Sequence, residues 1–323
     1  VREHSVNPAD ILVLTFTRIA AYDLKSKIRK AIESFDLGMP NITTLHSFAL
    51  IQLLRNSRII EYLPQPLRIA DDWEEENIIY QNLKADLKDH LRTILPEKRH
   101  LIDKIRKLFM DLSSDWEMLR KKENSKVRRY PKFISLWRLH REQFGYTLRS
   151  ELVYQLKKGL EQERDFSFDH EYKFALIDEY QDFNACDLAI VEQLSNRGLE
   201  IFAAGDDDQS IYGFRNADPN GIRSFAEEYG AEELELEICH RCDKSILELA
   251  EFVADLDPDR MPKKTRPKTD SLEGEVVLKQ STDQFNEAIW IAEKCDSLLK
   301  QEPKPSILIL MRNDFRGKIS EPL

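Results

Sequence analysis

The chain has 323 residues, of which 33% are charged and 41% hydrophobic, and its formal net charge is -10. No apolar run approaches the roughly 20 residues that a helix needs to cross a bilayer, and no segment resembles a signal peptide, so the composition excludes a membrane protein. The four cysteines include one C-x-x-C, Cys239 and Cys242, without a second pair. This is more typical of reduced cysteines in a cytoplasmic protein than of a zinc or redox site.

The charge is unevenly distributed along the sequence. Residues 98–141 contain 14 Lys or Arg against 5 Asp or Glu, although the whole chain is acidic. Such asymmetry indicates one basic face, and a solvated helical surface would give the same composition. The aromatic residues among these charges suit either a nucleic-acid surface or the core of a small helical domain. They are Trp116, Tyr130, Phe133 and Trp137.

The first predicted elements alternate between strands and helices. Residues 11–14 (ILVL) have the pattern of a buried strand, and the apolar positions over residues 20–31 recur at helical spacing. Residues 42–48 (ITTLHSF) lead into a further helix over residues 47–55. We expect that helix to pack Phe48, Ile51 and Leu54 on the sheet.

From about Pro64 to Phe144 the pattern is helical and strongly charged, which predicts an inserted helical domain. Trp73, Ile78 and Leu83 are assigned to its core. Another amphipathic helix, residues 148–160, then returns to the main sheet.

Two further apolar runs end in polar residues. Residues 174–177 lead into Asp178 and Glu179, and residues 199–204 lead into Gly205 and Asp206. Short continuous apolar runs are typical of strands buried in a parallel sheet, and ligands of such sheets collect at the carboxyl ends of the strands. We therefore expect Asp178, Glu179, Asp206 and Gln209 along one crevice, where an Asp-Glu pair can hold Mg²⁺ and polarise an attacking water.

The last part of the chain predicts the start of a second sheet. Residues 234–238 are assigned to a strand and residues 245–254 to a helix, followed by a proline-rich linker. Beyond it, a strand at 275–279 (EVVLK), a helix at 282–299 and a strand at 306–310 (SILIL) give a βαβ pattern.

Several strings carry a family resemblance. DEYQD at 178–182 and GDDDQSIYGFR at 205–215 closely resemble motifs II and III of the UvrD/PcrA/Rep group of superfamily 1 DNA helicases. LTFTRIAA, from Leu14, resembles motif Ia, with Arg18-Ile19 where Asn-Lys is usual. ITTLHSF resembles motif Ib, and Arg241 aligns with the arginine of motif IV, although its neighbours do not match.

The resemblance implies an α/β fold: a RecA-like P-loop NTPase parallel sheet with an inserted all-helical subdomain and the start of a second RecA-like domain. Residues 1–60 and 147–266 would form domain 1A, residues 61–146 the helical insertion 1B, and residues 267–323 the beginning of domain 2A.

The resemblance also implies the roles of individual residues toward ATP and Mg²⁺. Asp178 and Glu179 would hold the metal, and Glu179 would activate the attacking water. Gln209 and Arg241 would contact the terminal phosphate, because a neutral amide can bond both phosphate and water and a guanidinium donates in a planar fork.

A second set of residues is implied to bind DNA, as a single strand or a junction between single and double strands. Phe16, Tyr212 and Phe214 would stack on bases, where stacking contributes roughly 1 to 3 kcal/mol per base. Arg215 would connect the nucleotide site with the DNA site. The strand backbone would be contacted by Thr17, His46 and Ser47.

A P-loop NTPase needs G-x-x-x-x-G-K-[ST] to hold the phosphates, and none of the ten glycines provides it. By the resemblance, this loop would lie upstream of Val1, and motifs V and VI downstream of Leu323. We therefore expect the chain alone to hydrolyse ATP feebly or not at all, while the parent protein is an ATP-dependent helicase or translocase, moving 3' to 5' on single strands in DNA repair or recombination.

Two other hypotheses stay open. The chain could belong to a non-catalytic DNA-binding protein descended from a helicase, which kept the DNA residues and lost the phosphate loop. It could also be the motor part of a helicase-nuclease. A glycine-rich loop upstream of Val1 would argue against the first, and a nuclease domain far downstream would support the second.

Overall fold

The computed structural model describes residues 6–32, 38–60, 62–94, 100–213 and 216–311. The chain divides into two compact units. The first comprises Val1–Leu234 with Asp259–Pro262, and the second comprises Glu235–Pro258 with Lys263–Leu323.

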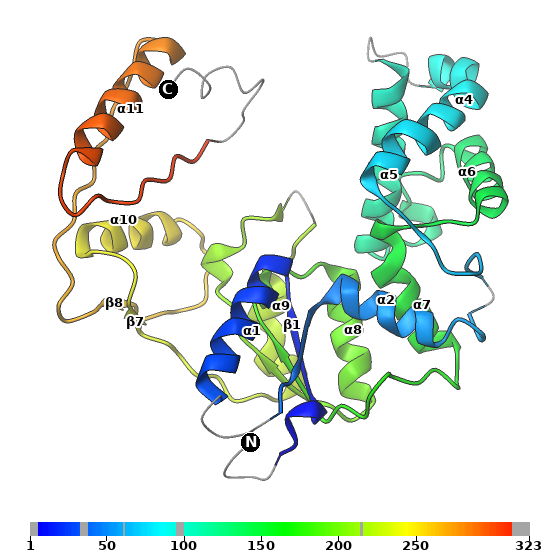
Figure 1. Cartoon of the computed structure of the whole chain (residues 1–323), viewed down its shortest axis with the longest axis horizontal. Helices are drawn as coiled ribbons and strands as arrows, with labels where there is room; N and C mark the ends of the chain where they lie inside the picture. Colours follow the sequence, from blue (N-terminus) through cyan, green and yellow to red (C-terminus); the bar gives the residue numbers. More distant parts are fainter. Residues whose placement is uncertain (1–5, 33–37, 61, 95–99, 214–215, 312–323) are drawn as a thin grey trace. The chain divides into compact units, whose positions relative to one another are not determined.

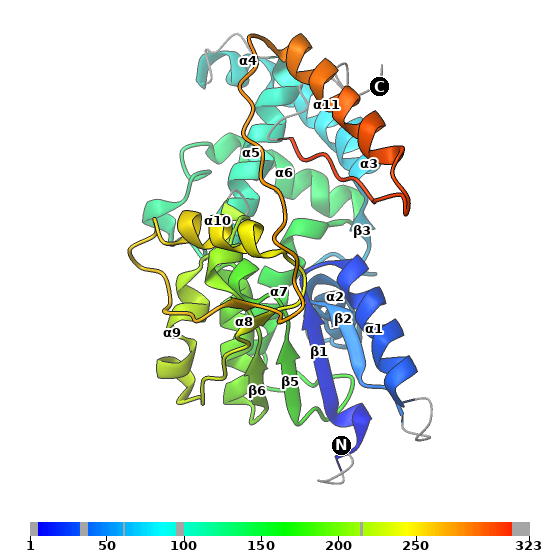
Figure 2. The same cartoon turned by 90° about the vertical axis from the view of Figure 1, so that its left-hand side faces the viewer.

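Four short strands form a parallel sheet in the first unit (Figure 2). In order across the sheet they are β2 (Asn41–Thr44), β1 (Ile11–Thr15), β5 (Phe174–Ile177) and β6 (Glu200–Ala203). Ile177 of β5 lies opposite Leu14 of β1 on one side and Ala203 of β6 on the other. The predicted α/β fold with a parallel sheet is confirmed.

Side chains alternate across β1, as the pleat of a strand requires. Leu12 and Leu14 belong to the larger hydrophobic core, and Val13 between them packs with Ala21 in a smaller one. The smaller core is formed with α1 (Arg18–Ile32). The larger core contains side chains of α2 (Leu45–Arg55), α7 (Leu152–Gln162), α8 (Ala185–Asn196) and α9 (Asn220–Tyr229). The sheet therefore has helices on both faces.

The buried face of α2 differs from the predicted one. Phe48 is fully buried, as expected, whereas Ile51 and Leu54 are 42% and 48% exposed. The helix instead buries Ala49 and Leu53 with Phe48. The prediction was wrong for two of three positions because the packing of α7 against α2, and not helical spacing alone, determines which side of α2 is covered.

A helical segment lies between α2 and α7 in the sequence. It consists of α3 (Asp72–Glu74), a π-helical turn (Glu75–Ile79), α4 (Tyr80–Ile94), α5 (Leu101–Glu117) and α6 (Pro131–Phe144). It has a hydrophobic core of its own, which includes Leu83 and Phe133. The assignment of Trp73 and Ile78 to this core was wrong, since they are 66% and 37% exposed.

Two short parallel strands connect the two ends of this segment: β3 (Ile69–Ala70) pairs with β4 (Thr147–Leu148). A 3₁₀ turn, Arg149–Glu151, then precedes α7. Other 3₁₀ turns cover Pro8–Asp10, Lys122–Asn124, Tyr180–Asp182 and Asp207–Gln209. Among the helices that the structure describes, none combines the length and apolar character needed to span a membrane.

The second unit contains α10 (Lys244–Ala254), α11 (Gln284–Leu299) and one pair of two-residue strands, β7 (Ile238–Cys239) and β8 (Arg266–Pro267). The two helices confirm the helix predictions. The three predicted strands were wrong: 275–279 and 306–310 form none, and only Ile238 of 234–238 is in a strand. A strand needs a neighbour for its N–H and C=O groups, and no ladder pairs those two runs within the described residues.

Candidate functional site

The carboxyl ends of β1, β5 and β6 meet at one edge of the sheet, because all three strands are parallel and in register. The Asp178 N–H donates to Leu14 O at 2.9 Å, and the Ala204 N–H donates to Ile177 O at 2.8 Å. The Tyr180 N–H then donates to Ala204 O at 3.0 Å. The backbone thus brings the residues after β5 beside those after β6. We call Asp178, Glu179, Asp206 and Gln209 the strand-end site.

Asp178 and Glu179 carry the uncompensated charge of this site. Asp178 is half-buried, and burial, followed by the charge of Glu179, raises the pKa of the Asp178 carboxyl. Glu179 is exposed and has left-handed backbone angles, φ 54 and ψ 47. That conformation costs a non-glycine residue about 1 to 3 kcal/mol and is concentrated at functional sites. The pair offers hard carboxylate oxygens, and the proximity of its two negative charges fits a divalent cation such as Mg²⁺.

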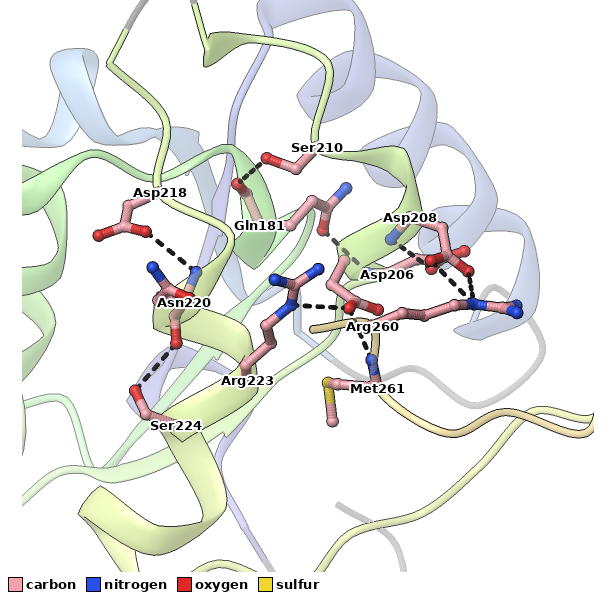
Figure 3. Close-up of polar contacts among 11 residues, drawn as sticks. Gln181, Asp206, Asp208, Ser210, Asp218, Asn220, Arg223, Ser224, Arg260 and Met261 are labelled. Atoms are coloured by element: carbon pink, nitrogen blue, oxygen red, sulfur yellow. Dashed lines mark hydrogen bonds and ion pairs between the residues drawn. The ribbon is translucent and has the colours of Figure 1, made fainter. Parts of the chain in front are cut away.

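Gln181 links the two sequence strings physically. Its Nε2 donates to Glu179 Oε2 at 2.8 Å, and its Oε1 accepts from the Asp206 N–H at 3.0 Å. Ser210 Oγ donates to the Gln181 carbonyl at 3.1 Å (Figure 3). Gln181 is fully buried, and a Cβ on Gly205 would come within 2.6 Å of its Oε1. One amide therefore connects Glu179 with the segment that carries Gln209, and Gly205 leaves the space for it.

Gln209 is exposed and lies beside Asp206. Its Nε2 donates to Asp206 Oδ2 at 2.7 Å, while Asp206 Oδ1 accepts from the Asp208 N–H at 3.2 Å. Asp178, Glu179, Asp206 and Gln209 thus all follow β5 or β6 at one edge of the sheet.

The next two aspartates are paired with arginines. Arg223 of α9 lies 2.9 Å from Asp207, and Asp207 also accepts from the Met261 N–H at 2.9 Å. Arg260 Nε contacts both carboxylate oxygens of Asp208, at 3.1 and 3.0 Å (Figure 3). Oxygens of Asp206, Asp207 and Asp208 lie within 4.8 Å of one another, as in a metal site. The arginines supply the positive charge here, so these ion pairs hold the loop in place.

An aromatic pair lies at the same edge of the sheet. The rings of Phe16, after β1, and Tyr212, after β6, are 5.3 Å apart at 41°. Both side chains are half-buried. Thr17 is exposed, and its Oγ1 accepts from the Ala20 N–H at 3.1 Å, which caps α1. The structure therefore brings Phe16 and Tyr212 together, although most of the sequence of the first unit lies between them.

His46 and Ser47 begin α2 at the end of β2. Because Thr44 of β2 pairs with Thr15 of β1, the two residues follow the sheet at the same edge as Phe16. His46 is exposed. Ser47 also has a structural role, since its N–H donates to Thr44 Oγ1 at 3.3 Å as part of the helix cap.

The structure does not relate three of the predicted residues to these groups. Phe214 and Arg215 lie outside the described residues. Arg241 belongs to the second unit, where it is exposed between β7 and α10.

All four cysteines are free. The Cys242 N–H donates to Cys239 Sγ at 3.4 Å, and this backbone N–H is the first cause of a lowered pKa of the Cys239 thiol.

Sequence reasoning missed the groups that hold the site together. Gln181 stood inside the DEYQD string without an assigned role, and its place in that string was the available signal. Arg223 and Arg260 had no signal, because each is distant in sequence from the aspartate that it pairs with.

Comparisons with known proteins agree with these features. The model of the UvrD/REP helicase N-terminal domain matches residues 1–230. The ATP-dependent DNA helicase PcrA of Staphylococcus epidermidis is 27% identical over 270 residues, which cover 81% of this chain and 36% of that protein. DNA helicase II of Haemophilus influenzae is 25% identical over 340 residues, covering 98% and 44%. A probable DNA helicase II homolog of Mycoplasma genitalium is 26% identical over 337 residues, covering 94% and 45%.

The chain spans less than half the length of these relatives. The domain match, in contrast, covers well over half of the chain and includes the whole strand-end site. The chain therefore belongs to the UvrD/REP helicase N-terminal domain family.

Proposed function

We propose that the protein is an ATP- and magnesium-dependent motor of the UvrD type, which moves along single-stranded DNA and separates duplexes. The observation that carries this proposal is the Gln181 bridge, because it joins the acidic pair after β5 to the segment that bears Gln209 and Tyr212. A nucleotide site and a strand-binding surface connected by one buried amide are what a motor needs to couple hydrolysis to movement. The printed names of the relatives, DNA helicases, support the same function.

At the nucleotide, Asp178 and Glu179 would hold Mg²⁺, which would supply positive charge against the charge of the phosphates. Glu179 would accept the proton of the attacking water, since its exposed carboxylate is fixed by Gln181. Gln209 would contact the terminal phosphate through its amide, which has both a donor and an acceptor. Arg241 of the second unit would supply a guanidinium to the same phosphate.

At the DNA, Phe16 and Tyr212 would each present a ring face to a base, independent of sequence. Thr17, His46 and Ser47 would contact the strand backbone. Phe214 and Arg215 are proposed to extend the same surface. The preferred DNA would be a single strand or its junction with a duplex, travelled 3' to 5' in repair or recombination in the cytoplasm.

For the domains, we propose that residues 1–60 and 147–266 form domain 1A, residues 61–146 form domain 1B, and residues 267–323 begin domain 2A. The separate hydrophobic core of the helical segment supports the second of these assignments. Because the 323 residues contain no glycine-rich phosphate loop, we also propose that this chain by itself hydrolyses ATP feebly.

The test is DNA-stimulated ATP hydrolysis by the whole protein. Glu179→Gln should lower the rate by about 10²- to 10⁴-fold, the usual contribution of a positioned general base, with DNA binding retained. Glu192→Gln, at an exposed position of α8, is the matched control and should leave the rate unchanged. Equal rates for both variants would contradict the assignment.

A further inference from the structure

A cavity of about 960 Å³ is lined by residues of α5, α6 and α7 and of the segment 62–65 in the first unit. Figure 1 shows these three helices in the same part of the first unit. Its volume is within the roughly 300 to 1,000 Å³ typical of small-molecule sites. The residues of the strand-end site and the Phe16 and Tyr212 pair are not among those that line it. We call it the helical cavity, and its presence is independent of the proposed motor function.

Aromatic rings make up one wall of the helical cavity. The ring centres of Trp137 and Trp116 are 5.8 Å apart. The ring centres of Trp116 and Tyr154 are 6.2 Å apart, and the planes of these two rings differ by only 24°. Trp116 and Tyr154 are half-buried. Lys158 Nζ lies 3.5 Å from the centre of the Tyr62 ring, which also lines the cavity. A continuous aromatic surface of this kind stacks on planar rings.

The lining is strongly cationic. Of the lining residues, Asp115 and Glu142 are acidic, against the basic residues Arg120, Lys122, Arg128, Arg138, Arg141 and Lys158. The Asp115 carboxylate is already engaged by Ser125 Oγ at 2.7 Å and by the Lys126 N–H at 2.9 Å. Arg128 and Arg138 are exposed at this surface. The excess positive charge is suited to an anion.

We propose that the helical cavity binds a nucleoside phosphate. The base stacks on Trp116 and Tyr154. The phosphate is held by Arg128 and Arg138, whose guanidinium groups are the side chains best suited to phosphate oxygens. A free nucleotide and the terminal nucleotide of a DNA strand carry the same chemistry.

The experiment is calorimetric titration of the chain with deoxyadenosine monophosphate. Arg138→Gln is the principal variant, because an exposed side chain can be changed without loss of the fold. It should weaken binding at least about tenfold, as expected for a charge-assisted hydrogen bond. Arg129→Gln, an exposed arginine outside the lining, should leave binding unchanged. Trp116→Leu, with its folding checked by circular dichroism, should also weaken binding by removing a stacking face.

Competition by short oligonucleotides separates the two sources of the ligand. Displacement by a strand with a terminal phosphate, but not by the same strand without it, would assign the cavity to a strand end. Failure of both strands to displace a bound mononucleotide would assign it to a free nucleotide. Absence of binding at about 1 mM, or binding equal in Arg138→Gln and Arg129→Gln, would overturn the proposal. These outcomes are independent of Glu179→Gln, so they do not test the motor function.

Discussion

The helical segment and the strand-end site differ in whether their carboxylates are paired with a cationic side chain. Glu151, fully buried where the helical segment meets α7, lies 2.9 Å from Arg141 Nη2 and accepts from Gln155 at 2.8 Å. At the strand-end site, by contrast, no ion pair joins Asp178 or Glu179 to a cation among the described residues. Charge that a protein leaves uncompensated is destabilising unless a ligand completes it. This difference supports the proposal that the strand-end site binds a cation.

The largest expected effect concerns the compensated pair. Arg141→Met should lower the free energy of unfolding by about 3 to 5 kcal/mol, because Glu151 would stay buried without its cation. Arg141→Met with Glu151→Leu should recover most of this loss, since two apolar side chains leave no isolated charge. Urea denaturation measures both. Arg138→Met, exposed on the same helix, is the control, and an equal loss in both single variants would refute this account of the pair.

Asp187 is a buried carboxyl that, unlike Glu151, forms no ion pair with an arginine among the described residues, so it tests what burial alone does. Burial raises the pKa of Asp187, at the start of α8, to about 7 from 3.8. The unfolded chain ionises this carboxyl above its ordinary pKa of 3.8, whereas the folded protein keeps it neutral up to about 7, so the free energy of unfolding falls by about 1 kcal/mol per pH unit between these two values. Asp187→Asn should therefore be more stable than wild type at pH 8 and equal to it near pH 4.

Melting temperatures at both pH values measure this effect. Glu192→Gln, exposed on the same helix, should show no pH-dependent difference. A variant Asp187→Asn that melts below wild type at pH 8 would mean that the Asn184 N–H, which donates to Asp187 at 3.1 Å, stabilises the ionised form more than burial opposes it.

The aromatic pair at the strand ends offers a test on DNA. Phe16→Ala with Tyr212→Ala should weaken binding of single-stranded DNA by about 10- to 100-fold, because two stacking faces are lost. The salt dependence should remain, since phosphate contacts are retained. Fluorescence anisotropy measures the affinity, and Tyr22→Ala, 77% exposed on α1, is the aromatic control. Equal affinities for the two variants would exclude the pair from the DNA surface.

The smallest expected effect concerns the contact between the two sequence strings. Gly205→Ala should cost at least about 1 kcal/mol of stability, because its Cβ would meet the buried Gln181. Gly213→Ala is the matched control, since a Cβ there meets nothing within 4 Å. Chemical denaturation compares them. If both variants were equally stable, Gln181 would not be held as tightly as its hydrogen bonds indicate.

The sequence by itself determined those helices and strands whose surroundings are uniform along their length. Residues 174–177 are buried in the middle of the sheet, and the predicted strand coincides with β5. The polar residues after each strand followed from the same pattern, because parallel strands end at a common edge. Where the environment was not uniform, periodicity failed. Ile51 was assigned to a buried face that α7 does not cover, and EVVLK was assigned to a strand that has no partner in the described residues.

Only the tertiary structure decided the contacts between distant segments. Phe16 meets Tyr212 because β1 and β6 lie in the same sheet on either side of β5, an order that no local pattern encodes. Arg260 meets Asp208 for a similar reason, and Trp116 of α5 meets Tyr154 of α7 although the two helices are distant in the sequence. Local sequence fixes hydrogen bonding and side-chain alternation along a segment. Which segments become neighbours depends on the packing of the whole core, and the helical cavity and the bridge through Gln181 depend on that packing.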